Sequence, residues 1–291
     1  MYEIYLQLSL YIGRKSNTMD LRGDAMARYT RRWNESVYKR YIREGRGRGC
    51  GSDYRPWLTV RDFPSLGMAS RIKGQTTGRV YHMMSNLETN LFYLLDWSDE
   101  VLDIREQYPL SDLCGAIEIA EKAQIRYPYD ARSGFPYVMT SDFYVDTING
   151  SVVLSVKPSS ELEKLRVREK LEIERRYWNA RNVKWELVTE REINFVKSRN
   201  IEWLAQASDL TQFDLSSELQ EMCKDYFLSS YTSSSDITNA LFEDLEARYG
   251  LPAGIGFNIY KHLAFHKIVD INVDQPINRT LFGSQSVKIT A

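Results

Sequence analysis

Hydrophobic positions follow two different periods through the first two thirds of the chain. Leu87, Leu91, Leu94 and Leu95 recur at spacings of three and four, which predicts an amphipathic helix over residues 85–97. Apolar and polar residues then alternate from Val101 to Tyr108 before Pro109, which predicts a strand. The same patterns predict helices over 114–126 and 161–181 and a strand over 185–189. This order of helices and strands indicates a mixed α/β core.

Two strands, 137–148 and 151–157, flank the dipeptide Asn149-Gly150, which is the strongest short signal for a β-hairpin. If these two residues are the centre of a type I′ turn, Asp142 lies opposite Lys157, and Tyr144 lies opposite Ser155. Side chains alternate between the two faces of a strand. One predicted face enters the core with Phe143, Val145, Leu154 and Val156; the other carries Asp142, Tyr144, Ser155 and Lys157.

The pattern changes after about residue 205, where helical segments such as 235–249 and 257–265 follow one another. We therefore expect three parts. They are a basic, partly helical N-terminal extension (1–42), a main α/β domain (43–205) and a smaller, mainly helical C-terminal domain (206–291).

Composition and charge narrow the possible partners. Hydrophobic residues make up 43% of the chain and charged residues 26%, as in folded globular proteins. No apolar run reaches the roughly 18–20 residues of a membrane span, and the short apolar start at 4–12 lacks the features of a signal peptide. Three widely spaced cysteines argue against a disulfide framework and fit a reducing cytoplasm.

The charges are unevenly distributed. Residues 1–60 hold 12 Lys and Arg against 6 Asp and Glu, whereas residues 208–250 hold 2 against 9. A basic section suits a polyanion such as DNA, and an acidic section suits a protein partner. The alternative in both cases is an ordinary solvated surface.

The candidate chemistry lies at the open end of the hairpin, where the predicted register brings Asp142 and Lys157 together. Asp142 and Glu88, at the start of the facing helix, supply hard oxygen ligands for a divalent metal. Lys157 beside them can orient the attacking water or stabilise charge in phosphodiester hydrolysis. Two alternatives remain. Asp142 and Lys157 form a surface ion pair worth about 1 kcal/mol or less, or Glu88 completes a capping box with Ser85.

Other residues suggest DNA contacts. Arg46 and Arg48 lie in a Gly-Arg run (44–49) that fits phosphate binding or a flexible connector. Arg175 and Arg176 precede Tyr177 and Trp178, which fits a nucleic-acid surface or an amphipathic helix. His262 and His266 have no acid between them and favour a structural helix over a metal site. His82 is expected to touch DNA or support the entry of the helix, without a catalytic role.

The order of Glu88, Asp142 and Ser155-Val156-Lys157 resembles the restriction-endonuclease-like, PD-(D/E)xK nuclease core. Longer stretches resemble the TnsA family, the endonuclease subunits of heteromeric bacterial transposases. The resemblance covers about residues 43–205, most clearly 44–47, 53–60, 85–88, 101–107, 139–143, 156–158, 170–178 and 200–204, and thins afterwards.

The resemblance implies a restriction-endonuclease-like mixed sheet flanked by helices, with the endonuclease domain at 43–205 and a winged-helix-like interaction domain at 206–291. It implies Mg²⁺-dependent cutting at the 5′ ends of a transposon, with Mn²⁺ as a possible substitute. Glu88, Asp142 and the Val156 carbonyl are the implied metal ligands, and Lys157 is the implied catalytic lysine. Ser155 departs from the Glu or Gln that relatives carry, so it acts through a bridging water or is dispensable.

The implied partners are double-stranded DNA at transposon ends, a TnsB-like transposase and a TnsC-like ATPase regulator. The implied place is the bacterial cytoplasm, at the nucleoid during activity and without a membrane. Two alternatives stay open: a catalytically inactive assembly protein that bridges these partners and DNA, and a stand-alone restriction-type nuclease that cuts without them.

Overall fold

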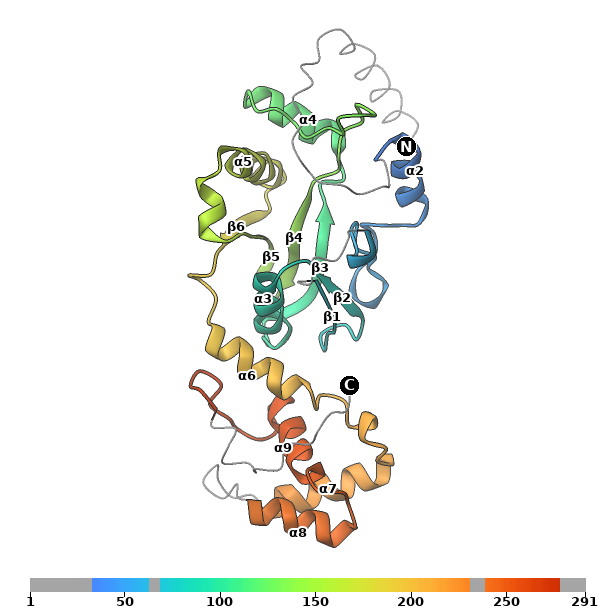
Figure 1. The fold of residues 1–291 in the computed structure, drawn as a ribbon, viewed down its shortest axis with the longest axis vertical. Coiled ribbons are helices and arrows are strands. Elements are labelled where there is room, and N and C mark those ends of the chain that lie inside the picture. The colour runs from blue at the N-terminus through green and yellow to red at the C-terminus, as the bar shows by residue number, and fades with distance from the viewer. Residues whose placement is uncertain (1–32, 63–68, 231–238, 278–291) are drawn as a thin grey trace. The chain divides into compact units, whose positions relative to one another are not determined.

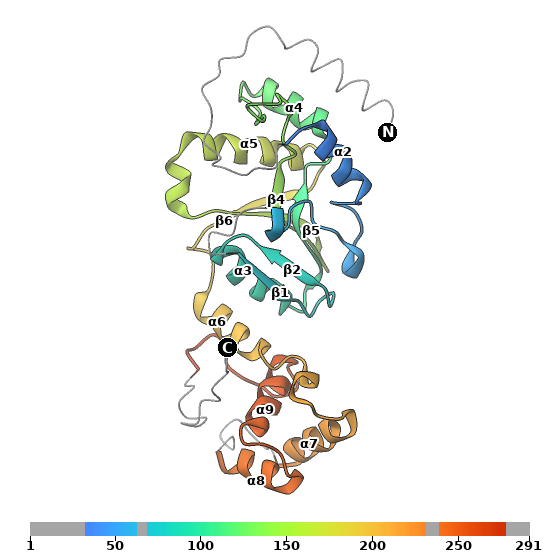
Figure 2. The ribbon, with the colours of Figure 1, turned by 45° about the vertical axis from the view of Figure 1, so that its right-hand side comes forward.

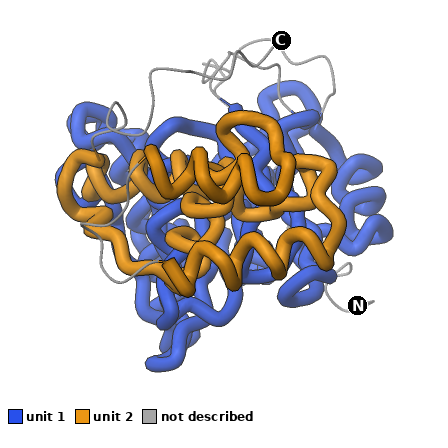
Figure 3. The backbone as a smooth tube through the Cα atoms, turned by 90° about the horizontal axis from the view of Figure 1, so that it is seen from below, with its two compact units in different colours: residues 1–193 blue, residues 194–291 orange. Residues whose placement is uncertain are grey.

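The chain forms two compact units, residues 1–193 and 194–291 (Figure 3). The computed structural model describes residues 33–62, 69–230 and 239–277. Sequence patterns predict the boundary near residue 205, whereas the structure divides the chain between Ile193 and Asn194. Helix α6 (Phe195–Ala205) therefore belongs to the second unit, where Asn200 donates to the carbonyls of Val273 and Gln275.

A four-stranded mixed sheet forms the centre of the first unit, in the order β3-β4-β5-β6 (Figure 1). The neighbours β3–β4 and β4–β5 are antiparallel, and β5–β6 is parallel. Figure 2 shows α4 and α5 on one side of the sheet and α3 on the other. This is the mixed α/β, restriction-endonuclease-like architecture that the sequence predicts. The strands are β3 (Val101–Pro109), β4 (Thr140–Thr147), β5 (Gly150–Val156) and β6 (Lys184–Val188).

The flanking helices begin where the sequence supplies caps. The Ser85 hydroxyl accepts from the Glu88 amide at the start of α3 (Asn86–Asp96), and the Asp112 carboxylate accepts from the Gly115 amide at the start of α4 (Leu113–Lys122). The predicted helix over 161–181 is in fact two elements. A 3₁₀ turn (Ser159–Glu163) follows Pro158, and α5 (Leu165–Asn179) comes after it.

The hairpin of β4 and β5 has a different register from the predicted one. Thr147 pairs with Gly150, so Ile148 and Asn149 form the turn, and Asp142 is not opposite Lys157. The predicted pairing was wrong by two residues because a type I′ turn needs positive φ at both central positions. Here only Gly150 has positive φ, at 117°. A shift of two residues leaves every side chain on its predicted face.

A short hairpin that the sequence patterns did not predict lies next to α3. It consists of β1 (Ser70–Lys73) and β2 (Val80–Met83), which pair antiparallel. Arg79 fixes it to β3, because its guanidinium donates to the Glu106 carboxylate at 2.9 Å and to the Ile104 carbonyl at 2.8 Å. Strands of four residues are too short to show a clear period of two.

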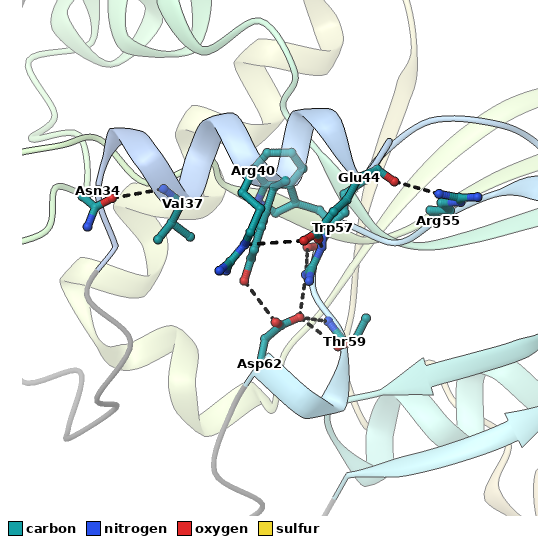
Figure 4. Close-up of polar contacts among 10 residues, drawn as sticks. Asn34, Val37, Arg40, Glu44, Arg55, Trp57, Thr59 and Asp62 are labelled. Atoms are coloured by element: carbon teal, nitrogen blue, oxygen red, sulfur yellow. Dashed lines mark hydrogen bonds and ion pairs between the residues drawn. The ribbon is translucent and has the colours of Figure 1, made fainter.

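The segment before the sheet is fixed by polar contacts around Asp62 (Figure 4). Helix α2 (Glu35–Arg43) is capped by Asn34, whose side chain accepts from the Val37 amide. Asp62 accepts from the amide and hydroxyl of Thr59, each at 2.8 Å. Trp33, Tyr38, Tyr41 and Trp57 pack together beside these contacts. The rest of the predicted N-terminal extension, residues 1–32, lies outside the described residues.

In the part of the second unit that the structure describes, 194–230 and 239–277, the regular elements are helices, and no strand forms a wing. The mainly helical character is as predicted. His262 and His266 each bond through one ring nitrogen to a backbone carbonyl, of Ala207 and Ser208, at 3.1 and 2.9 Å. The helices are α6, α7 (Ser217–Ser230), α8 (Asn239–Tyr249) and α9 (Ile255–Phe265), with a 3₁₀ turn at Leu210–Phe213.

None of the helices in the described ranges combines the length and apolar character that crossing a bilayer requires. Cys50, Cys114 and Cys223 are all free thiols.

Candidate active site

The candidate site lies where β4 begins and β5 ends. Asp142 is the third residue of β4, and Lys157 follows the last residue of β5. Helix α3 brings Glu88 in its first turn, and α5 brings Glu174 from its middle. The sheet thus holds an aspartate and a lysine between two helices that each supply one glutamate.

Asp142 and Lys157 are in direct contact despite the changed register. The Lys157 ammonium donates to Asp142 Oδ2 at 2.9 Å and to the Val156 carbonyl at 2.8 Å. The Val156 amide donates to the same Asp142 oxygen at 2.6 Å. Asp142 is only 8% exposed, so this is not the surface ion pair of the first alternative. The ammonium therefore bridges two of the oxygen donors that the sequence assigned to a metal.

Glu88 does form the predicted capping box and is also part of the site. Its carboxylate accepts from the Met84 amide and from the Ser85 hydroxyl, both at 2.9 Å. It is buried, and Asp142 is near enough for its charge to affect the titration of Glu88. The capping and functional interpretations are therefore compatible, because the cap fixes the carboxylate at the end of the sheet.

Glu174 is the residue that the sequence analysis did not assign. It is buried against the sheet, where Ser155 donates a hydrogen bond to its carboxylate. The Trp185 indole donates to the same serine oxygen at 3.0 Å. A signal was available, because Leu171, Glu174 and Trp178 share one helical face, and a glutamate on an apolar stripe needs a partner or a role.

Burial and mutual charge perturb the titration of these groups. Burial, followed by the negative charge of Asp142, raises the pKa of Glu88 to about 7 and the pKa of Glu174 to about 7. Burial acts to lower the pKa of Lys157, but the surrounding carboxylates, Asp142 first, outweigh it and raise this pKa. Closely spaced acids with raised pKa values beside a cation are typical of functional sites.

The donors at this site suit a hard cation, since all of them are oxygens. Among the residues described, no group of three or more His, Cys, Asp and Glu side chains is arranged to hold a metal ion. Mg²⁺ needs no such cage, because it usually keeps several waters and binds through one or two carboxylates together with a substrate phosphate. Glu88, Asp142 and the Val156 carbonyl fit that requirement, with Glu174 as a further buried acid.

The raised pKa values predict that the metal-free chain loses stability as the pH rises from about 5 to about 8. Glu88 ionises near 4.5 when unfolded and near 7 when folded, so its contribution to stability is complete below 4.5 and is lost as the pH passes 7. In Glu88→Gln this loss should be smaller by about 1–3 kcal/mol. Urea unfolding followed by tryptophan fluorescence at both pH values measures it.

Glu172→Gln is the matched control. Hydrogen bonds from Arg175 lower the pKa of Glu172 to about 2, so it stays ionised in both folded and unfolded chains over this pH range. Its replacement should leave the pH dependence of the unfolding free energy unchanged. An equal pH-dependent loss in wild type and Glu88→Gln would contradict the assignment of Glu88.

The four arginines that the sequence suggests for DNA lie in different environments. Arg46 is 17% exposed at its side chain, bonds to Asp62 at 2.7 Å and stacks on Tyr41 at 3.6 Å. Arg48 is exposed. Arg175 and Arg176 both pair with Glu172 on the same helix. The structure thus gives Arg46 a role in holding its own segment, and DNA binding by these four residues stays a prediction.

Comparisons with known proteins match both units. Residues 98–190 match a family model described as the TnsA-like endonuclease N terminal, and residues 192–273 match one described as the TnsA endonuclease C terminal. The boundary between these matches agrees with the division of the chain into two units. The chain is also 38% identical over 269 residues to the transposon Tn7 transposition protein TnsA of Escherichia coli, covering 87% of this chain and 97% of that protein.

Proposed function

Because the chain belongs to the TnsA family of endonucleases, we propose that it is the subunit of a transposase that nicks DNA at the 5′ ends of the transposon. The observation that carries the proposal is the contact between Lys157 and Asp142, with Glu88 and Glu174 close to the same aspartate. Four elements of the fold, β4, the end of β5, α3 and α5, converge to make this cluster, and no packing requirement of the core calls for three acids there.

We propose Mg²⁺ as the cofactor, with Mn²⁺ as a substitute. When bound, it supplies Lewis-acid polarisation of the scissile phosphate and lowers the pKa of a coordinated water. Asp142, Glu88 and the Val156 carbonyl would hold it. Lys157 already contacts two of these oxygens, so it has to release at least one of them to expose the donor set.

Lys157 would then be placed to stabilise negative charge on the phosphate or to orient the attacking water. Its raised pKa keeps it cationic at neutral pH, which suits charge stabilisation and not proton abstraction. Ser155 holds the Glu174 carboxylate and is itself buried, so its proposed role is to position that acid.

The proposed partners are double-stranded transposon ends, a TnsB-like transposase that acts on the other strand, and a TnsC-like ATPase regulator. The acidic section 208–250, within the second unit, supports a protein-contact role for that unit. The proposed place of action is the bacterial cytoplasm, at the nucleoid, since the matched relative is bacterial.

Strand-specific nicking tests the proposal. Transposon-end DNA labelled separately on each strand is incubated with the chain, the partner transposase subunits and Mg²⁺. We expect cuts on the 5′ strand when the chain is present, and none on that strand when it is left out. An assembly that forms and joins 3′ ends, yet never cuts the 5′ strand, would identify the chain as an inactive bridging protein. Efficient cutting by the chain alone would favour a stand-alone nuclease.

A further inference from the structure

Gln107 on β3 has a backbone conformation that glutamine rarely adopts. Its φ is 48°, in the left-handed region, although the strand continues on both sides of it, from Val101 to Pro109. Glycine takes this conformation routinely, and asparagine and aspartate do so occasionally. The residue is also buried, with 4% of its surface exposed. Residues held in sparsely populated conformations cluster at active sites and ligand-binding sites.

The register of the sheet places Gln107 beside the acid at the centre of the candidate site. Strands β3 and β4 are neighbours (Figure 1). Gln107 is opposite Asp142, because both lie between the same two antiparallel pairs, Glu106 with Phe143 and Tyr108 with Ser141. Directly opposed residues of neighbouring strands have Cβ atoms about 4.5–5.5 Å apart. A group bound at the aspartate is therefore within reach of the long glutamine side chain.

The side-chain amide of Gln107 is bonded at one end only. Its Oε1 accepts from the Thr140 hydroxyl at 3.0 Å, and Thr140 lies two residues before Asp142 on β4. The backbone is anchored too, since the Gln107 carbonyl accepts from the Trp57 amide at 3.3 Å. Among the residues that the structure describes, none accepts a hydrogen bond from Nε2. A donor in so buried a residue is costly without an acceptor, which indicates that a ligand supplies one.

Asp142 has an available oxygen at the same place. The Val156 amide and the Lys157 ammonium both donate to Oδ2, and within the described ranges no donor bonds to Oδ1. Oδ1 is thus open to a divalent cation, and Mg²⁺ usually binds through one or two carboxylates together with a substrate phosphate. The phosphate that is cut would therefore lie beside Asp142. Gln107 is neutral, so it adds a hydrogen-bond donor there without repelling the cation as another lysine would.

We propose that Gln107 binds the phosphate that is cut, with its Nε2 amide donating to a non-bridging oxygen. This role rests on the nuclease function above. Glutamine is one of the side chains that commonly contact phosphate oxygens in protein–DNA complexes. A donor that meets negative charge as it develops on the phosphoryl group also stabilises the transition state. The bonds to Thr140 and Trp57 hold the amide in place before DNA binds, so little freedom is lost on binding.

A metal ligand is the other role that this amide could take, through Oε1. That oxygen already accepts from Thr140. The group left without a partner is the donor Nε2, and a donor suits the oxygens of a phosphate and not a cation. Phosphate binding therefore accounts for the arrangement better than metal binding does, and the two roles predict opposite results for an acidic replacement.

The test is nicking of transposon-end DNA by the full-length chain in its assembly, in single-turnover reactions with Mg²⁺. Gln107→Gly removes the amide and suits a positive φ, so its melting temperature should not fall below that of wild type. Loss of one donor to the reacting phosphate should slow nicking by about 10²-fold. Gln107→Glu keeps the size of the side chain and its bond from Thr140, but it replaces the donor by an acceptor. It should slow nicking at least as much.

A phosphorothioate at the scissile position separates contact with the phosphate from a structural effect. Sulfur accepts hydrogen bonds poorly, so one of the two stereoisomers should slow the wild-type chain by about tenfold or more through loss of the bond from Gln107. In Gln107→Gly the slowing caused by the same isomer should be smaller by about that factor, because the two changes remove one interaction. A purely structural role for Gln107 would leave the effect of sulfur unchanged.

Gln124→Gly is the matched control. Gln124 also has positive φ, 57°, but it is exposed just beyond the end of α4. Its replacement should leave both the nicking rate and the effect of sulfur at their wild-type values. The control shows whether placing glycine at a left-handed glutamine slows the chain for reasons unrelated to the phosphate.

Three results would overturn the role of Gln107 in a wild-type chain that nicks. They are a wild-type rate in Gln107→Gly, an undiminished effect of sulfur in that variant, and nicking by Gln107→Glu as fast as wild type, which would identify a metal ligand. A wild-type chain that assembles but never nicks overturns the nuclease function itself, and the role of Gln107 with it. The wild-type reaction thus distinguishes the two failures.

Discussion

Asp142→Asn is expected to lower the rate of 5′-strand nicking by about 10³-fold or more while the chain still assembles with its partners. Within the described ranges, the aspartate is the acid that contacts Lys157, and it lies near both Glu88 and Glu174. Loss of its charge would remove the main oxygen donor for a divalent cation. Metal stabilisation of the transition state is worth several kcal/mol, and about 4 kcal/mol corresponds to 10³ in rate.

Asp146→Asn on the same strand is the matched control. Asp146 also pairs with a cation, Arg105, and accepts from Ser151 at 2.5 Å, but it lies four residues farther along β4. Its replacement should leave the nicking rate nearly unchanged. The rates are compared in single-turnover reactions with saturating partner subunits. Nicking by Asp142→Asn within tenfold of wild type would remove this aspartate from the catalytic role.

The parts of the site that the sequence could predict are those with local signals. Ser85 and Glu88 form a capping box that the S-x-x-E pattern defines, and the cap fixes the acid at the end of the sheet. Asp142 and Lys157 could be assigned to one end of a hairpin because Asn149 and Gly150 mark a turn nearby. Residues only a few positions apart in the sequence determine both the helix cap and the presence of the turn.

The register and the extra hairpin depend on information that no short pattern contains. The turn consists of Ile148 and Asn149, and not of Asn149 and Gly150 as predicted. Backbone conformation decides between the two, because Gly150 has positive φ and Asn149 does not. The predicted contact between Asp142 and Lys157 is present although the predicted register was wrong, because a lysine side chain is long enough to reach back past Val156. The β1–β2 hairpin is specified largely by Arg79 meeting Glu106, a contact between residues 27 positions apart.

Glu174 is the clearest example of a residue whose role a short sequence pattern cannot predict, because that role depends on which face of α5 meets the sheet. Ser155 stands where relatives carry Glu or Gln, and the sequence left it either a role through a bridging water or none. In the structure the serine hydroxyl instead donates to Glu174, so an acid from the neighbouring helix stands behind the position that the strand leaves vacant. We therefore expect the carboxylate of Glu174 to matter more for cleavage than the hydroxyl of Ser155, which only positions it.

Glu174→Gln is accordingly expected to slow nicking by about 10²-fold and to raise the Mg²⁺ concentration needed for half-maximal rate. The amide keeps the size of the side chain and its ability to accept from Ser155, but it loses the negative charge that a cation requires. Ser155→Ala removes the hydroxyl and leaves the acid, so its effect on the rate should stay within about tenfold.

A merely structural role for Glu174 predicts a different result. Replacing a buried acid whose pKa is raised to about 7 by a neutral amide should not destabilise the fold at pH 8, where the ionised acid is costly. Slow nicking together with an undiminished melting temperature would therefore place Glu174 in the chemistry. If Glu174→Gln instead nicks at the wild-type rate with an unchanged Mg²⁺ requirement, this third acid only fills space behind Ser155, and Glu88 and Asp142 are the acids that hold the cation.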